Sequence, residues 1–212
     1  MRLTIFIFLT LISASQAFGD VRSEQRLWLG VFSKKKITEH YLFWTEAQLR
    51  YDQTHQTMNQ TMNRFGLLRN LNQNHEIGLL FSFIQTGLTK EYRPTIQHVY
   101  SDNRPLNNFS LRTRLEGRDI EDSDANSLRL RSQVRLAHTL NPTYDLVVWD
   151  EAFVNLTHEQ WTGNHFVDRN RFFLGTRGKY EQIIFEIGYM NQYIPRNTVS
   201  LSEHALILYL FL

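Results

Sequence analysis

Segments in which apolar and polar side chains alternate recur along this chain at intervals of roughly 15 to 20 residues. The segment 41–52 is the clearest case. One of its faces carries Tyr41, Phe43, Thr45, Ala47, Leu49 and Tyr51, and the other carries Leu42, Trp44, Glu46, Gln48, Arg50 and Asp52. Successive side chains of a strand point to opposite faces. The pattern therefore predicts a β-strand with one apolar side and one polar, charged side.

The same alternation marks further segments, and it predicts an all-β chain. It is found in 91–97, 109–116, 128–136, 169–174 and 183–192. These strands look about ten to twelve residues long, whereas strands of globular proteins most often have about five or six. Transmembrane strands need about nine to eleven residues. We therefore predict a single-domain, antiparallel up-and-down transmembrane β-barrel.

The spacing of aromatic residues supports a membrane barrel over a water-soluble one. Tyr41 and Tyr51 end the apolar face of one segment, and ten residues of strand span about 33 Å. At a tilt near 45° the height is about 23 Å, close to the roughly 25 Å apolar band between the aromatic girdles of such barrels. Tyr92 and Tyr100 bracket a second segment in the same way. A soluble sandwich or a periplasmic lipocalin-like binding barrel is the alternative.

The connections between segments predict the number of strands. Shorter connections are expected near 33–38, 72–75, 102–107, 138–143 and 176–179, and longer or more polar ones near 53–60, 85–90, 119–126, 156–165 and 193–200. This alternation is typical of periplasmic turns and outer loops. The scheme gives eleven segments, but bacterial single-chain barrels have even strand numbers. We therefore expect ten strands, without the first segment 26–32, or else twelve.

The first residues have the pattern of an export signal. Arg2 precedes the apolar run 3–12, and small residues follow, with Ser15 and Ala17 placed as at a cleavage site. We predict a signal peptide over 1–17 and a barrel domain over 18–212, exported to the outer membrane of a Gram-negative bacterium. Outer-membrane lipid, lipopolysaccharide and the barrel-assembly machinery are then the expected partners.

Composition excludes several other classes. The chain has no cysteine, which excludes disulfides and thiolate chemistry, and no helix-length apolar run follows the first residues. Its 23 Lys and Arg against 21 Asp and Glu give a net charge of +2, so no nucleic-acid partner is expected. The mean hydropathy is −0.38. Alternating strands average to such a neutral value, so a barrel remains compatible with it.

The order of charged and aromatic residues resembles a known family. The matching positions are Trp28, Glu46, Arg50, Glu91-Tyr92-Arg93-Pro94, Gln97, Arg112, Arg114, Glu116, Arg118, Arg129, Arg131, Glu151, Phe153, Arg169, Arg171, Glu186-Ile187-Gly188-Tyr189-Met190 and His204. In this order they are similar to domain-of-unknown-function family 2490, uncharacterised outer-membrane barrels. The resemblance implies a fold and a location, but it implies no activity.

The polar faces of the segments predict a charged barrel lumen. The residues expected to point inward are Glu46, Arg50, Glu91, Arg93, Arg112, Arg114, Glu116, Arg129, Arg131, Arg135, Arg169, Arg171 and Glu186. Because buried charges are tolerated when paired, one interpretation is an Arg–Glu network with a structural or transport-related role. Arginines outnumber carboxylates, however, and fixed positive charge in a narrow pore favours anions. A small, porin-like anion channel, or a site for an acidic ligand such as a lipid phosphate, is the second interpretation.

An outer-membrane acyl hydrolase is a further alternative, because Ser202 and His204 share one face of the last segment. Two residues of strand separate positions by about 7 Å, which argues against direct contact. Ser110 and His98 are expected on opposite faces, so no catalytic residue is assigned. His158, Glu159, His165 and Asp168 match no metal-ligand motif. We therefore expect no metal and no cofactor.

Overall fold

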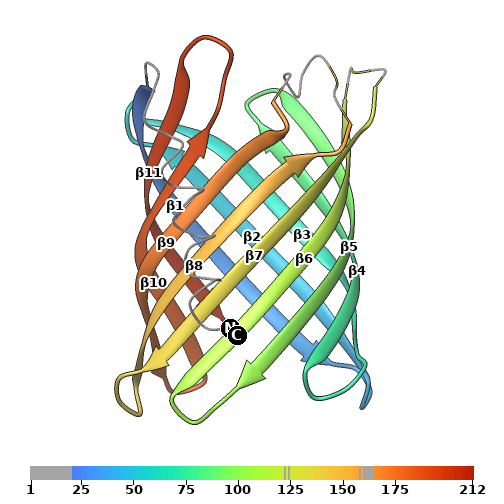
Figure 1. Cartoon of the computed structure of the whole chain (residues 1–212), viewed down its shortest axis with the longest axis vertical. Helices are drawn as coiled ribbons and strands as arrows, with labels where there is room; N and C mark the ends of the chain where they lie inside the picture. Colours follow the sequence, from blue (N-terminus) through green and yellow to red (C-terminus); the bar gives the residue numbers. More distant parts are fainter. Residues whose placement is uncertain (1–20, 122, 124, 158, 160–164) are drawn as a thin grey trace.

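The computed structural model describes residues 21–121, 123, 125–157, 159 and 165–212. The predicted signal peptide therefore lies outside the described residues. The strands are β1 Val21–Lys36, β2 Tyr41–Asp52, β3 Thr57–Asn70, β4 His75–Thr86, β5 Thr89–Asn103, β6 Asn107–Ile120, β7 Ser127–Thr139, β8 Tyr144–Asn155, β9 Val167–Tyr180, β10 Ile183–Ile194 and β11 Ser200–Phe211. Figure 1 shows them steeply tilted around a common axis. No described helix is long and apolar enough to cross a membrane.

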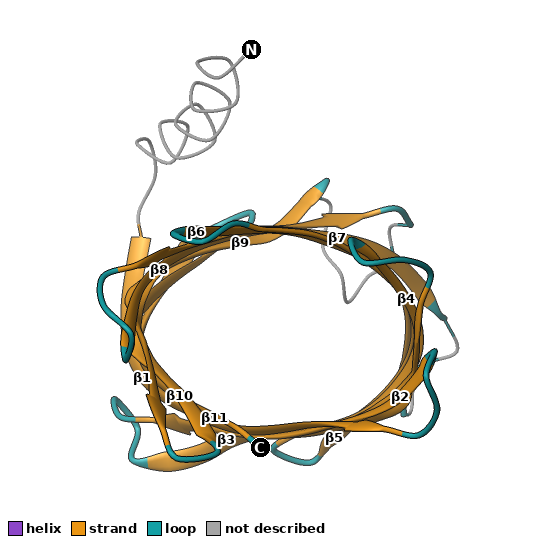
Figure 2. Ribbon diagram, turned by 90° about the horizontal axis from the view of Figure 1, so that it is seen from below, coloured by secondary structure: helices purple, strands orange, loops and turns teal. Residues whose placement is uncertain are grey.

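The strands form one closed barrel, seen end-on as a flattened ring in Figure 2. Each strand pairs antiparallel with its neighbour in sequence, and β1 then pairs with β11 in parallel, with Val21 opposite Ser200 and Phe32 opposite Phe211. The predictions of ten strands and of purely antiparallel pairing are therefore wrong. The segment 26–32, which the even-number rule would remove, belongs to β1. Parallel pairing at one seam lets an odd number of strands close without a free edge.

The connections lie on two rims. The lower rim in Figure 1 carries the turns 37–40, 71–74, 104–106, 140–143 and 181–182, and the upper rim carries the turns 53–56, 87–88 and 195–199 together with the strand ends that flank the β6–β7 and β8–β9 connections. The predicted alternation of shorter and longer connections holds except between β2 and β3, where 53–56 is no longer than 37–40 or 71–74, and between β4 and β5. That connection was expected near 85–90, but it is a two-residue turn in which Gly87 adopts φ +58°. Glycine adopts this left-handed conformation without steric cost, so the turn can be short.

The two faces of the barrel wall differ as the alternation predicts. In β2, Glu46 and Asp52 are buried in the interior, whereas Tyr41, Phe43 and Leu49 are exposed on the outside. Exposed large hydrophobic side chains occur on the outer face of every described strand except β6. The outer face is therefore an apolar belt, and the polar side chains are directed to the lumen.

One side of the lumen holds an apolar cluster that packs β1 against β7–β11. Its buried members are Trp28, Ala137, Val147, Trp149, Phe173, Met190, Ala205 and Ile207. The Trp149 and Phe173 rings stack with centroids 5.0 Å apart. Gly175 and Gly188 leave room for the Phe173 ring, because a Cβ on either glycine would lie within 2.7 Å of it. This cluster holds together the strands that carry many of the charged lumen residues.

Candidate functional site

Arginine side chains surround a cavity inside the barrel. The structure places all thirteen residues predicted to face inward on the lumen side, and Glu116 is fully buried behind the cavity surface. The cavity has a volume of about 420 Å³, and among the described residues eleven arginines and five glutamates line it. Most of these arginines come from β6, β7 and β9, because consecutive inward positions of these strands carry arginine. The cavity surface is therefore strongly cationic.

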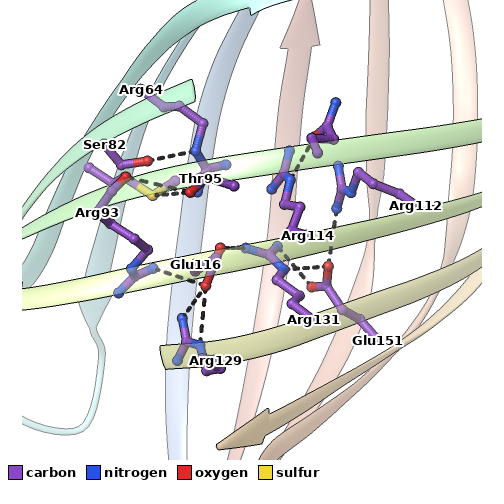
Figure 3. Close-up of polar contacts among 12 residues, drawn as sticks. Arg64, Ser82, Arg93, Thr95, Arg112, Arg114, Glu116, Arg129, Arg131 and Glu151 are labelled. Atoms are coloured by element: carbon purple, nitrogen blue, oxygen red, sulfur yellow. Dashed lines mark hydrogen bonds and ion pairs between the residues drawn. The ribbon is translucent and has the colours of Figure 1, made fainter. Parts of the chain in front are cut away.

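Two buried glutamates organise the cationic wall, as Figure 3 shows. Glu116 accepts hydrogen bonds from Arg129 at 2.6 Å and from Arg131 at 3.3 Å. Glu151 accepts from Arg131 at 2.6 and 2.9 Å and from Arg112 at 3.1 Å. We call Arg112, Glu116, Arg129, Arg131 and Glu151 the paired network. Because these bonds are charge-assisted and largely shielded from water, they hold the guanidinium groups in fixed positions.

Further ion pairs extend this arrangement along the wall. Glu46 accepts from Arg64 at 2.9 Å, and Arg64 also donates to the Ser82 hydroxyl at 2.7 Å. Nearer the upper rim, Glu91 accepts from Arg93 at 2.7 Å and from Arg118 at 2.6 Å. Towards the lower rim, Glu186 pairs with Arg135 at 3.1 Å. Glu46 and Glu91 bridge neighbouring strands or successive inward positions, and Glu186 on β10 reaches past β9 and β8 to Arg135 on β7, so these pairs stiffen the wall.

Two lumen arginines have no carboxylate within 4.0 Å among the described residues. Arg114 donates to the Gln97 side-chain oxygen at 2.7 Å, and Arg50 contacts the Gln48 side-chain oxygen at 3.4 Å. The Arg50 Nε has no hydrogen-bond partner in the described part of the chain. Neutral oxygens therefore accept their hydrogen bonds without balancing their charges, and both residues line the cavity.

Aromatic rings support several of these guanidinium groups. The Arg50 guanidinium lies 3.7 Å from the centroid of the Trp28 ring, and that of Arg171 lies 4.9 Å from the same ring. We call Trp28, Arg50 and Arg171 the Trp28 cluster. The Phe153 ring centroid lies 4.6–5.8 Å from four guanidinium groups, those of Arg129, Arg131, Arg169 and Arg171. A ring face attracts a cation without neutralising its formal charge, so the charge of Arg50 stays available to a ligand, whereas Arg171 also pairs with Glu151 at 3.5 Å.

A second cavity, of about 580 Å³, lies towards the upper rim. Trp28, Arg50, Gln60 and Arg169 line both cavities. The lining of the upper cavity includes Glu24, Asp52 and Glu203 as well as Arg26, so its charges are more evenly balanced. The two spaces therefore adjoin at a boundary formed by these four residues.

Several charged lumen residues escaped the sequence analysis. Arg26, Arg64, Arg118, Glu151, Asp168, Arg177 and Glu203 are the main ones. Arg64 was missed because the inward face of β3 also carries Met62 and Leu68, so the segment does not separate into polar and apolar faces. Asp168 lies at a register shift of the β8–β9 pair, and it faces inward beside Arg169, with which it pairs at 2.8 Å. An alternation pattern cannot place two successive residues on one face.

Among the described residues, those considered for metal binding do not form a site. His158 lies outside the described residues, and no group of three or more His, Asp or Glu in the described part of the chain could hold a metal ion. Asp168 is instead bound to Arg129 at 2.7 Å. It belongs to the ion pairs of the lumen.

The closed wall, the apolar exterior and the polar lumen define a porin-like β-barrel. A solved structure described as "NanC porin structure in rhombohedral crystal form" has the same fold, with a TM-score of 0.55 and 12% identity over 84% of this chain and 94% of that one. The chain belongs to the family described as "Protein of unknown function (DUF2490)", whose model matches residues 25–202. The resemblance seen in the sequence is thereby confirmed. No curated protein matches the chain in sequence.

Proposed function

We propose that this protein is an outer-membrane barrel that passes small anionic solutes through an arginine-lined lumen. The observation that carries the proposal is the lining of the central cavity by eleven arginines and five glutamates among the described residues. A surplus of fixed positive charge inside a narrow, low-dielectric space concentrates anions and repels cations. Porin-type conduction is therefore the role that best fits this lumen.

The outer surface supports a place in the membrane. Leu79, Phe65 and Ile96 are each at least half exposed on the outer face, and similar side chains occur around almost the whole barrel. Exposed apolar surface on this scale favours contact with lipid or another apolar partner over contact with water. A closed barrel leaves no unpaired strand edge in the bilayer. The structurally similar protein is itself named a porin.

Paired and unpaired arginines have different roles in this proposal. The paired network fixes the wall, because each of its guanidinium groups is held by a buried carboxylate. Arg50 and Arg114 have no such carboxylate, so an acidic solute in the cavity can pair with the half-buried Arg50, while Arg114, which is 2% exposed, adds to the positive potential around it. Bidentate binding of carboxylate or phosphate suits the planar guanidinium group. The wall would thus be structural, and the unpaired pair would set the preference for anions.

The proposal is tested by measuring the reversal potential of the refolded protein in planar bilayers under a KCl gradient. We expect wild-type current carried mainly by chloride, and a clear loss of chloride preference in the double variant Arg50→Gln, Arg114→Gln. Arg104→Gln is the matched control, because Arg104 is exposed near the lower rim and pairs with Asp102 outside the lumen. Bilayers that stay silent at high protein concentration would refute conduction and leave a structural role for the network.

A further inference from the structure

A group of polar side chains lies on the outer face of the barrel, where β10 pairs with β11. It consists of Tyr189, Asn191, Ser202 and His204, and none of these residues faces the lumen. Asn191 is opposite His204 in the strand register, and Tyr189 is opposite Leu206. The lumen proposal uses none of these residues. Polar groups in apolar surroundings are costly unless they bond to one another.

The side chains of this group form a connected chain of hydrogen bonds. The Ser202 hydroxyl lies 3.4 Å from His204 Nε2, and the other ring nitrogen, Nδ1, contacts the Tyr189 hydroxyl. Asn191 Nδ2 donates to the Ser202 hydroxyl oxygen at 2.8 Å. The expectation that Ser202 and His204 stay about 7 Å apart is therefore wrong for their side chains. The backbone spacing holds, but the imidazole extends along the strand and reaches the hydroxyl.

We propose that Ser202 and His204 form an esterase site that faces the lipid and cleaves acyl esters of membrane lipids. A serine nucleophile needs a base within hydrogen-bond reach, and that base needs a third group to orient it. His204 Nε2 is the base. The Tyr189 hydroxyl accepts from His204 Nδ1–H, which leaves Nε2 free to accept the serine proton. Asn191 offers an amide N–H beside the serine oxygen, the type of donor that stabilises an oxyanion.

The surroundings of the site suit a lipid ester. Ser202 is the third residue of β11 from the upper rim, so it lies within about 7 Å of the strand end. In a membrane-spanning barrel this depth is near the boundary between head groups and hydrocarbon, where lipid esters are found. Leu206, Leu208 and Ile187 continue the same outer face below the site and are exposed. An acyl chain can lie along these three side chains while its ester reaches Ser202.

The reaction is ordinary ester hydrolysis with water as the second substrate. The Ser202 Oγ bonds to the ester carbonyl carbon as its proton passes to His204 Nε2, and Asn191 Nδ2 donates to the resulting oxyanion. The bond from the carbonyl carbon to the alcohol oxygen then breaks, and His204 returns the proton to that oxygen. Water attacks the acyl-serine, again through His204, and this releases the fatty acid and restores the Ser202 hydroxyl.

The inference depends on the proposed membrane location but not on conduction, so the test uses protein refolded in detergent. Fatty acid release is measured in mixed micelles with phosphatidylethanolamine and, separately, with lipopolysaccharide. Release from the first lipid identifies glycerol esters as substrate, and release from the second alone identifies acyl esters of the saccharide lipid. A barrel that hydrolyses lipid but conducts no ions would refute the channel and support this inference.

Substitutions at the site locate the activity. We expect Ser202→Ala and His204→Gln to lower the release rate by roughly 10²–10⁴-fold, the range of a lost acid–base group. Ser132→Ala is the control, because Ser132 also faces outward but contacts Thr113 and no histidine. Tyr189→Phe tests positioning, and we expect kcat to fall by about tenfold, the effect of about one hydrogen bond, with KM unchanged.

A second readout does not depend on turnover. A long-chain alkyl sulfonyl fluoride should modify Ser202 in the wild-type protein, detected by mass spectrometry of the peptide, and should fail to modify it in His204→Gln. Folding of each variant is checked by its shift in gel mobility on boiling. Wild-type protein that releases fatty acid from neither lipid and is not labelled, or Ser202→Ala protein that keeps the wild-type rate, would overturn the inference.

Discussion

The paired network and the Trp28 cluster hold the same kind of side chain in two different ways. In the paired network, Glu116 and Glu151 bind guanidinium groups from β6 and β7 at distances of 2.6–3.3 Å. In the Trp28 cluster, Arg50 stacks on an indole ring and has no carboxylate within 4.0 Å among the described residues. The first arrangement neutralises charge and fixes geometry. The second fixes geometry while the charge stays available.

This difference shows how a barrel of this size can combine a rigid interior with a cationic one. A charge buried away from water destabilises the fold unless it is paired. Removing one partner of a buried pair therefore lowers the unfolding free energy by more than the intact pair contributes to it. The paired network therefore has to stay complete. Arg50 and Trp28 line both cavities and Arg50 is half-buried, so water can reach the Arg50 guanidinium group and reduce this cost. Stability and selectivity are thus assigned to different arginines.

The largest effect on stability is expected from Glu116→Gln. This substitution removes, at a site with no solvent exposure, the carboxylate that Arg129 and Arg131 share, and it leaves them only Asp168 and Glu151 as carboxylate partners. Breaking a buried ion pair costs about 3–5 kcal/mol of unfolding free energy. Urea unfolding of the refolded protein, followed by tryptophan fluorescence, measures the change. A variant as stable as wild type would show that the network contributes nothing to the fold.

Arg50→Gln is expected to change the unfolding free energy less, because its two contributions oppose each other. The variant loses a cation–π contact, which contributes about 0.5–2 kcal/mol of stability. It also removes a charge that is partly buried without a carboxylate partner, and this opposes the loss. We therefore expect its unfolding free energy to stay within about 1 kcal/mol of wild type. The same unfolding measurement applies. A loss as large as that of Glu116→Gln would remove the distinction between the two groups of arginines.

The smallest effect is expected from Glu121→Gln at the upper rim. Glu121 pairs with Lys90 at 3.0 Å, and both side chains are about 40% exposed. Exposed pairs contribute about 0–1 kcal/mol, because water and salt screen them. Unfolding in low and in high salt should show a small change that shrinks further as salt rises. A change that exceeds that of Arg50→Gln would mean that rim pairs, not lumen pairs, stabilise this barrel.

The alternation of side chains predicted much of the wall. Strands such as β2, β6 and β7 were recognisable because each turns a polar face to the lumen and an apolar face outward, so a period of two was visible. Strand β3 was harder to read, since Met62, Arg64 and Leu68 share its inward face. The inward direction of Arg129 and Arg131 followed from sequence, but their shared partner Glu116 did not. The register between two strands decides which of their residues meet, and the pattern within one strand does not specify that register.

The closure of the barrel shows the same limit. The rule that bacterial barrels have even strand numbers favoured ten strands, and it failed because β1 pairs in parallel with β11. Backbone spacing alone also could not predict the contact between Ser202 and His204. This contact depends on side-chain direction and on Tyr189 from the neighbouring strand.

The sequence by itself determined that this is a β-barrel with an apolar exterior and an arginine-rich interior, because side-chain alternation is a local property of each strand. Only the tertiary structure decided the number of strands, the arginines that find a carboxylate and the meeting of the Ser202 group on the outer wall. Each of these depends on the pairing of strands that are distant in sequence. That pairing is fixed when the whole ring closes and buries its charges together.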